Sequence, residues 1–115
     1  MGDTGLDLLR GTLDLMLLRA LAWHPMHGYA AAKWVRAASK DTLDVDDRAL
    51  YIALHRLEAR KLIRGRWQTT STGRKAKIYE LTAAGRARLK ADLSQWERYV
   101  RAMGNLLSAN LVEQQ

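Results

Sequence analysis

The chain has 115 residues, of which 48% are hydrophobic, and it carries a formal net charge of +7 at pH 7 with no cysteine. This length suffices for one modest domain, and the lack of cysteine excludes disulfide frameworks, thiolate metal sites and cysteine nucleophiles. Charged residues interrupt the first apolar stretch, so we find no pattern typical of a membrane span or an export signal. We therefore expect a cytoplasmic protein with no membrane partner, no metal and no cofactor.

An apolar periodicity predicts a first helix over residues 6–22. Three leucines lie off the main stripe of this helix (Leu8, Leu15 and Leu18). A helix that is apolar on more than one side needs more than one partner, and the second partner could be another subunit. The helix should end before Pro25, because the residue before a proline avoids helical angles. A second helix is expected over residues 29–39.

The third helix has the clearest start. Asp46 is a suitable N-cap, and Asp47 complements the positive end of the helix dipole. One face of this helix is apolar, with Leu50, Ala53, Leu54 and Leu57. The other side carries Arg48, Tyr51, Ile52, His55 and Arg56. The pattern predicts a helix that is buried on one side and offers basic and aromatic groups on the other.

After Lys61, β-forming residues replace the helical period. Two strands are predicted over residues 62–69 and 75–81, joined by a polar turn that contains Gly73. Basic residues dominate this hairpin, namely Arg64, Arg66, Arg74, Lys75 and Lys77. We expect Arg74 and Lys75 to be placed where they can contact phosphates or enter a minor groove.

Thr82 is a suitable cap for the last helix. Apolar residues then recur at alternating spacings of four and three, at Leu89, Leu93, Trp96, Val100, Met103 and Leu107. Such a seam is typical of a helix that packs lengthwise on another helix. Gly104 weakens the helix by roughly 1 kcal/mol relative to alanine, so residues from Ser108 onward are expected to be loose.

The positive charge is concentrated in the middle of the chain. Residues 48–90 contain twelve Lys or Arg against two Asp or Glu, whereas residues 1–47 and 91–115 each carry a small excess of acidic groups. A basic segment between such flanks is typical of a polyanion-binding surface. A solvated basic face without a partner is the alternative interpretation.

Three helices, a basic hairpin and a terminal helix follow one another, an order that suits a winged helix-turn-helix. The predicted fold is mainly α-helical with a small β-hairpin wing (α+β), with a DNA-binding unit over residues 1–82 and a dimerisation helix over residues 83–115. Because the major groove of B-DNA accepts one helix, the third helix would read bases. The predicted contacts to double-stranded DNA are Arg48, Tyr51, Ile52, His55, Arg56, Arg74, Lys75 and Lys77. The alternative is a winged-helix module that docks on an acidic protein partner without binding DNA.

Motifs along most of the chain resemble those of a known family. They are RGTLD at residues 10–14, HGY at residues 27–29, LYIALHRLE at residues 50–58 and GRKAKIYELTAAG at residues 73–85. Found in this order, they resemble the PadR family of transcriptional regulators over roughly residues 9–107. The resemblance implies a homodimer that represses transcription from a palindromic operator and is not an enzyme.

The resemblance also implies where two subunits meet. In this family the terminal helix reaches across and packs against the first helix of the partner. The implied dimer interface is formed by Leu9, Leu13, Leu17, Leu93, Trp96, Val100, Met103 and Leu107. Some family members stack flat aromatic ligands on a tryptophan at the place of Trp96, which implies a small aromatic effector. The alternative interpretation is that Trp96 is simply a residue of the dimer core.

Three positions depart from the family pattern. Ile52 follows the tyrosine of the third helix where the family often has proline, and Arg48 and Lys61 stand where it often has glycine. Because Arg48 and Ile52 lie on the side of the third helix that would read bases, the operator sequence cannot be carried over from the family.

Overall fold

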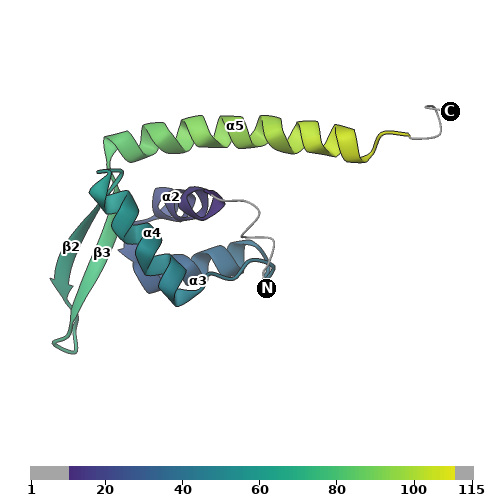
Figure 1. The fold of residues 1–115 in the computed structure, drawn as a ribbon. Helices are drawn as coiled ribbons and strands as arrows, with labels where there is room; N and C mark the ends of the chain where they lie inside the picture. The colour runs from purple at the N-terminus through teal and green to yellow at the C-terminus, as the bar shows by residue number, and fades with distance from the viewer. Residues whose placement is uncertain (1–10, 111–115) are drawn as a thin grey trace.

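The computed structural model describes residues 11–110, which form a helical body, an antiparallel sheet and a long terminal helix (Figure 1). The elements are, in order, α2 (Thr12–Trp23), β1 (Met26–His27), α3 (Gly28–Ala38), α4 (Asp47–Ala59), β2 (Ile63–Thr69), β3 (Lys75–Leu81) and α5 (Ala83–Leu107). This order confirms the predicted winged helix-turn-helix and adds β1, which the sequence analysis missed. The predicted start of the first helix at Leu6 lies outside the described residues.

The hydrophobic core lies where α2, α3 and α4 meet the base of the hairpin. Its largest fully buried side chains are Leu17, Leu18, Leu50, Leu54, Leu57 and Ile63. The predicted apolar face of α4 is confirmed, because all four of its members are buried. Packing this face inward leaves the opposite side of α4 in contact with solvent.

Local backbone chemistry sets both ends of α4. The Asp46 carboxylate accepts a hydrogen bond from the backbone N–H of Ala49 at 3.1 Å, which confirms the predicted N-cap. At the other end, Lys61 adopts a left-handed conformation with φ of 62°, the region that favours glycine. The N–H of Leu62 then donates to the carbonyl of Leu57 at 3.0 Å. The chain therefore leaves α4 through a tight turn directly into β2.

The sheet has the strand order β1-β3-β2, and both pairings are antiparallel. β2 and β3 pair along their whole length, with Gly65 opposite Tyr79 and Trp67 opposite Lys77. β1 contributes only Met26 and His27, which pair with β3 near its C-terminal half. This pairing attaches the hairpin to the segment that enters α3.

α5 begins at the base of the hairpin and crosses α2. The Thr82 hydroxyl accepts from the backbone N–H of Gly85 at 3.0 Å, which confirms the predicted cap. Gly85 is buried, and a Cβ at this position would lie 1.9 Å from the carbonyl oxygen of Leu62, so only glycine fits. Beyond α2 the helix continues away from the body, giving a molecule of 69 × 30 × 21 Å (Figure 1).

Candidate nucleic-acid interface

The outer side of α4 presents four adjacent exposed residues, Arg48, Tyr51, Ile52 and His55. Tyr51 is 52% exposed and Ile52 is 55% exposed, so both side chains are open to solvent beside Arg48 and His55. Within residues 11–110, the guanidinium of Arg48 forms no ion pair. We call these four residues the reading face; their exposure agrees with the predicted orientation of the helix.

The tip of the β2–β3 hairpin offers a second group of free cations. The turn is closed by a hydrogen bond from the N–H of Thr70 to the carbonyl of Arg74 at 2.7 Å, with Gly73 at a φ of 82°. Arg74 and Lys75 are exposed, and neither side chain has an acidic partner in the described part of the chain. These two residues are therefore available to bind an anion.

The other arginines of the hairpin are already paired. Arg64 and Arg66 both bond the Glu80 carboxylate across the strands, at 2.6 and 3.2 Å. The hydrogen bond from Arg64 lowers the pKa of the Glu80 carboxyl below its ordinary value, and the charge of Arg66 acts in the same direction. The side chains of both arginines remain largely exposed, yet their charge is shared with Glu80.

Two of the predicted DNA contacts, Arg56 and Lys77, form ion pairs within the protein. Arg56 bonds Asp14 of α2 through two guanidinium nitrogens, on the side of α4 away from the hairpin. Lys77 is half-buried, and its ammonium donates to Glu58 at 2.9 Å. Because each charge is matched by a carboxylate, a DNA phosphate would have to compete with that carboxylate for either residue.

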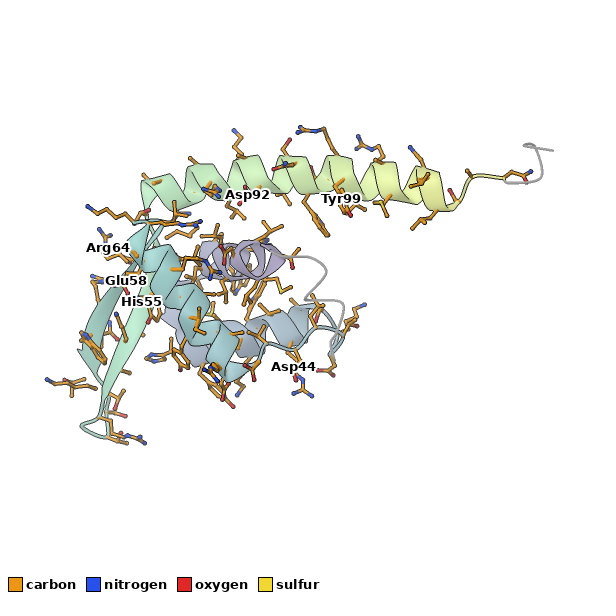
Figure 2. All side chains as sticks on the ribbon, viewed as in Figure 1. Asp44, His55, Glu58, Arg64, Asp92 and Tyr99 are labelled. Carbon is orange, nitrogen blue, oxygen red and sulfur yellow. The ribbon has the colours of Figure 1, made fainter. Side chains whose placement is uncertain are left out.

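The structure also shows a residue that the sequence analysis did not single out, Glu58. It lies on α4 beside the hairpin, as Figure 2 shows, and touches both strands of the wing. Its partners lie 7 and 19 residues further along the chain. No local spacing reveals such a contact, although Glu58 and Glu80 are the only acidic residues among residues 48–90.

The residues predicted to form a dimer interface fall into two groups. On α5, Leu93, Val100 and Leu107 are 40%, 48% and 75% exposed, and Met103 and Trp96 are partly exposed. Their side chains leave an apolar strip along α5, which we call the α5 seam.

Where the structure describes them, the interface residues predicted on the first helix are less exposed than the leucines and the valine of the α5 seam. Leu17 is fully buried in the core of its own chain, which corrects its assignment to the interface, because no part of it is left for a partner. Leu13 is partly buried and packs against that core. Leu9 lies outside the described residues.

Trp96 lines two hollows beside α5. Its ring lies 5.7 Å from that of Tyr99, centroid to centroid. One hollow, of about 870 Å³, is bordered by α2, α4 and α5 and includes the side chains of Arg56, Arg60 and Asp92. The other, of about 310 Å³, is mostly apolar and lies between α2, α3 and α5. Trp96 thus borders both hollows.

Two further features are absent from residues 11–110. No cluster of three or more potential metal-ligating side chains is found there. No helix of this region has the length and apolar character needed to cross a membrane.

Known proteins that are similar to this chain are transcriptional regulators. The model of the transcriptional regulator PadR-like family matches residues 17–91. A PadR family regulator from Eggerthella lenta is 30% identical, with 91% of this chain and 89% of that chain covered and a TM-score of 0.75. A PadR-like regulator from Bacillus cereus is 25% identical, with 90% and 99% covered and a TM-score of 0.77. A transcriptional regulator from Clostridium thermocellum, at 24% identity, shares the fold with a TM-score of 0.78 over 86% and 96% of the two chains.

The family match spans the core, α4, the wing and the start of α5, so it covers the elements that carry the reading face and the free cations of the hairpin tip. PadR-like regulators bind DNA, are typically dimeric and are not enzymes. This chain belongs to the PadR-like family of transcriptional regulators.

Proposed function

We propose that the protein is a homodimeric repressor that binds a palindromic operator through α4 and the wing of each subunit. One observation carries this proposal: the reading face of α4 and the free cations of the hairpin tip are all exposed and lack acidic partners within residues 11–110. A duplex supplies the matching chemistry, because base edges line its major groove and phosphates line its rim.

Each residue of the reading face has a contact that fits its chemistry. Arg48 lies in the first turn of α4, where a recognition helix reaches base edges, and its guanidinium can bond a guanine at two atoms. Ile52 lies one turn further and fits the methyl group of a thymine. Tyr51 and His55 can donate to phosphate or base acceptors beside them. Arg48 and Ile52 therefore carry the sequence preference in this proposal.

The wing supplies contacts that do not depend on sequence. Arg74 and Lys75 lie at the end of a two-stranded hairpin that projects from the body on the side of α4 (Figure 1). Cations at such a tip can bind phosphates or enter the adjacent minor groove. Each phosphate that they neutralise releases counterions, so binding should weaken steeply as salt is added.

The α5 seam supports the dimeric part of the proposal. Among the residues of α5 only Gly85 is buried, although the helix has 25 residues and a heptad pattern of apolar side chains. An apolar strip of this kind is unfavourable in water and is normally covered. A second copy of this chain would cover it and place two reading faces on one duplex with two-fold symmetry.

The regulatory part of the proposal concerns Trp96. A flat aromatic molecule that stacks on this ring would enter the hollows between α5 and the body, and it would thereby change how α5 sits on α2. Because α5 would join the two subunits, such a change would alter the spacing of the two reading faces and release the operator.

The test starts from a pool of random-sequence duplexes, from which the wild-type protein selects its ligands at low and at moderate salt. We expect a selected sequence with two-fold symmetry and two chains bound per duplex. The logarithm of the binding constant should fall linearly with the logarithm of the salt concentration. Placed upstream of a reporter gene, the selected sequence should lower expression when the protein is present. Selection of no common sequence, or binding by a single chain, would contradict the proposal.

A further inference from the structure

One carboxylate links the recognition helix to both strands of the wing. Glu58 is in the last turns of α4, and its Oε1 accepts from the Lys77 ammonium of β3 at 2.9 Å. Its Oε2 accepts from the backbone N–H of Gly65 of β2 at 3.3 Å. In Figure 2 Glu58 lies on the side of α4 that faces the hairpin. We call Glu58, Gly65 and Lys77 the wing clamp.

The surroundings of Lys77 hold its ammonium in place. Its Nζ lies 5.7 Å from the centre of the Trp67 ring and 5.4 Å from that of the Tyr79 ring, so an aromatic side chain from each strand is close to it. The hydrogen bond to Glu58 raises the pKa of Lys77 above its ordinary value, because the carboxylate favours the charged ammonium. Lys77 acts here as part of the hairpin's attachment to α4.

Gly65 is a requirement of the same arrangement. A Cβ at this position would lie 2.3 Å from the Cε of Lys77 and 3.1 Å from the Oε2 of Glu58. Any larger residue would push the lysine or the carboxylate aside. Because Gly65 has no side chain, Glu58 of α4 can reach Lys77 of β3 past strand β2.

The position of the wing clamp along the strands affects where the free cations of the hairpin tip lie. The register pairs Gly65 with Tyr79 and Trp67 with Lys77, so the wing clamp contacts the middle of the hairpin. Arg74 and Lys75 lie beyond that point, at the far end of the hairpin. A small change in the angle at the clamp would therefore move these cations relative to Arg48 on α4.

From this geometry we infer that Glu58 is a positioning residue for DNA binding: it fixes the angle between α4 and the wing, so that base reading and phosphate contact occur on the same duplex. The inference rests on the proposed function. Glu58 itself is not a DNA contact, because a carboxylate would repel phosphate and both of its oxygens already accept hydrogen bonds.

The test is a double-mutant cycle between the clamp and the tip. Glu58→Gln keeps the shape of the side chain but leaves one acceptor oxygen and no charge. Glu80→Gln is the matched control, because it makes the same chemical change on a carboxylate whose partners among residues 11–110 are Arg64 and Arg66 of the same hairpin. Each variant is combined with Arg74→Ala, and the affinity of the full chain is measured for a duplex selected by the wild type from a random pool.

We expect Arg74→Ala to weaken binding about fivefold in the wild type and in Glu80→Gln, but less than about twofold in Glu58→Gln. A merely destabilising change would leave the effect of Arg74→Ala unaltered at temperatures where the variant is folded. An equal loss from Arg74→Ala in all three backgrounds would overturn the inference. If Glu58→Gln does not fold, the same cycle with Lys77→Met gives the same two outcomes.

A second measurement needs no DNA. Amide hydrogen exchange at Gly65 and ¹⁵N relaxation of residues 70–74 should both report a more mobile hairpin in Glu58→Gln and an unchanged one in Glu80→Gln. Equal mobility in the two variants would overturn the inference that Glu58 fixes the hairpin, even if DNA binding is intact. Conversely, a wild type that binds no duplex would defeat the proposed function while these spectra still report on the clamp.

Discussion

Placing a charge on the α5 seam should separate the subunits without unfolding them. Val100 is 48% exposed in the single chain and lies between Leu93 and Leu107 on this strip. Val100→Asp replaces an apolar group that a partner would cover with a carboxylate that would have no counterion there. The body should stay folded, because Val100 is not part of the core.

The size of the effect follows from the exposed areas. Leu93, Val100 and Leu107 together leave the equivalent of about one and a half fully exposed aliphatic side chains, so covering them would contribute about 2–5 kcal/mol per subunit. Val100→Asp removes about 1 kcal/mol of this per subunit and adds the cost of an unpaired buried carboxylate. The dissociation constant of the dimer should therefore rise at least about 100-fold.

Sedimentation equilibrium over a range of protein concentrations measures this constant directly. Ala102→Asp is the matched control, because it adds the same charge to an exposed position on the other side of α5, and it should leave the dimer intact. Circular dichroism and thermal unfolding show whether each variant is folded. A folded Val100→Asp variant that dimerises as tightly as the wild type would refute the assignment of the α5 seam as the subunit interface.

Three further predictions concern stability and ligand binding. Asp46→Ala should lower the free energy of unfolding by about 1 kcal/mol in urea denaturation, because it removes the cap of α4; an unchanged value would mean that the cap is dispensable. The hydrogen bond to Glu58 raises the pKa of Lys77, and burial raises that of Tyr79, from ordinary values of 10.5 and 10.0. Groups whose pKa is higher in the folded state contribute stability that is present below these values and lost above them, so the free energy of unfolding should fall as the pH rises past about 10. Tyr79→Phe should make the free energy of unfolding fall less steeply with pH. An identical dependence on pH would contradict the raised pKa of Tyr79 in the folded state. Planar aromatic compounds should quench the fluorescence of Trp96, so the wild type and Trp96→Ala should differ in ligand titrations; identical titrations would remove Trp96 from the effector site.

The ends of the elements could be predicted from local residues. Asp46 and Thr82 each accept a hydrogen bond from a backbone N–H three residues further on, an interaction within a single turn. The outward side of α4 was likewise predictable, because helical periodicity separates Leu50 and Leu54 from Tyr51. β1 was not, since two residues are too few to show a strand pattern.

The partners of charged side chains were the least predictable feature. Asp14 and Arg56 are 42 residues apart in sequence, and Glu58 and Lys77 are 19 apart. Such pairs depend on how α4 packs against α2 and the hairpin, which periodicity does not specify. For this reason the sequence alone does not distinguish the paired Arg56 and Lys77 from the free cations. The burial of Leu17 in its own core is unpredictable for a similar reason, because a helix that is apolar on several sides does not reveal which side its own core covers.

Base reading by α4 and phosphate contact by the wing are separated most directly by comparing Arg48→Ala with Lys75→Ala. The affinity of each variant is measured for the selected duplex and for a random duplex. Arg48→Ala should narrow the preference for the selected duplex by about 1–3 kcal/mol, whereas Lys75→Ala should weaken binding to both duplexes by the same factor. Equal effects of the two substitutions on both duplexes would contradict this division of roles.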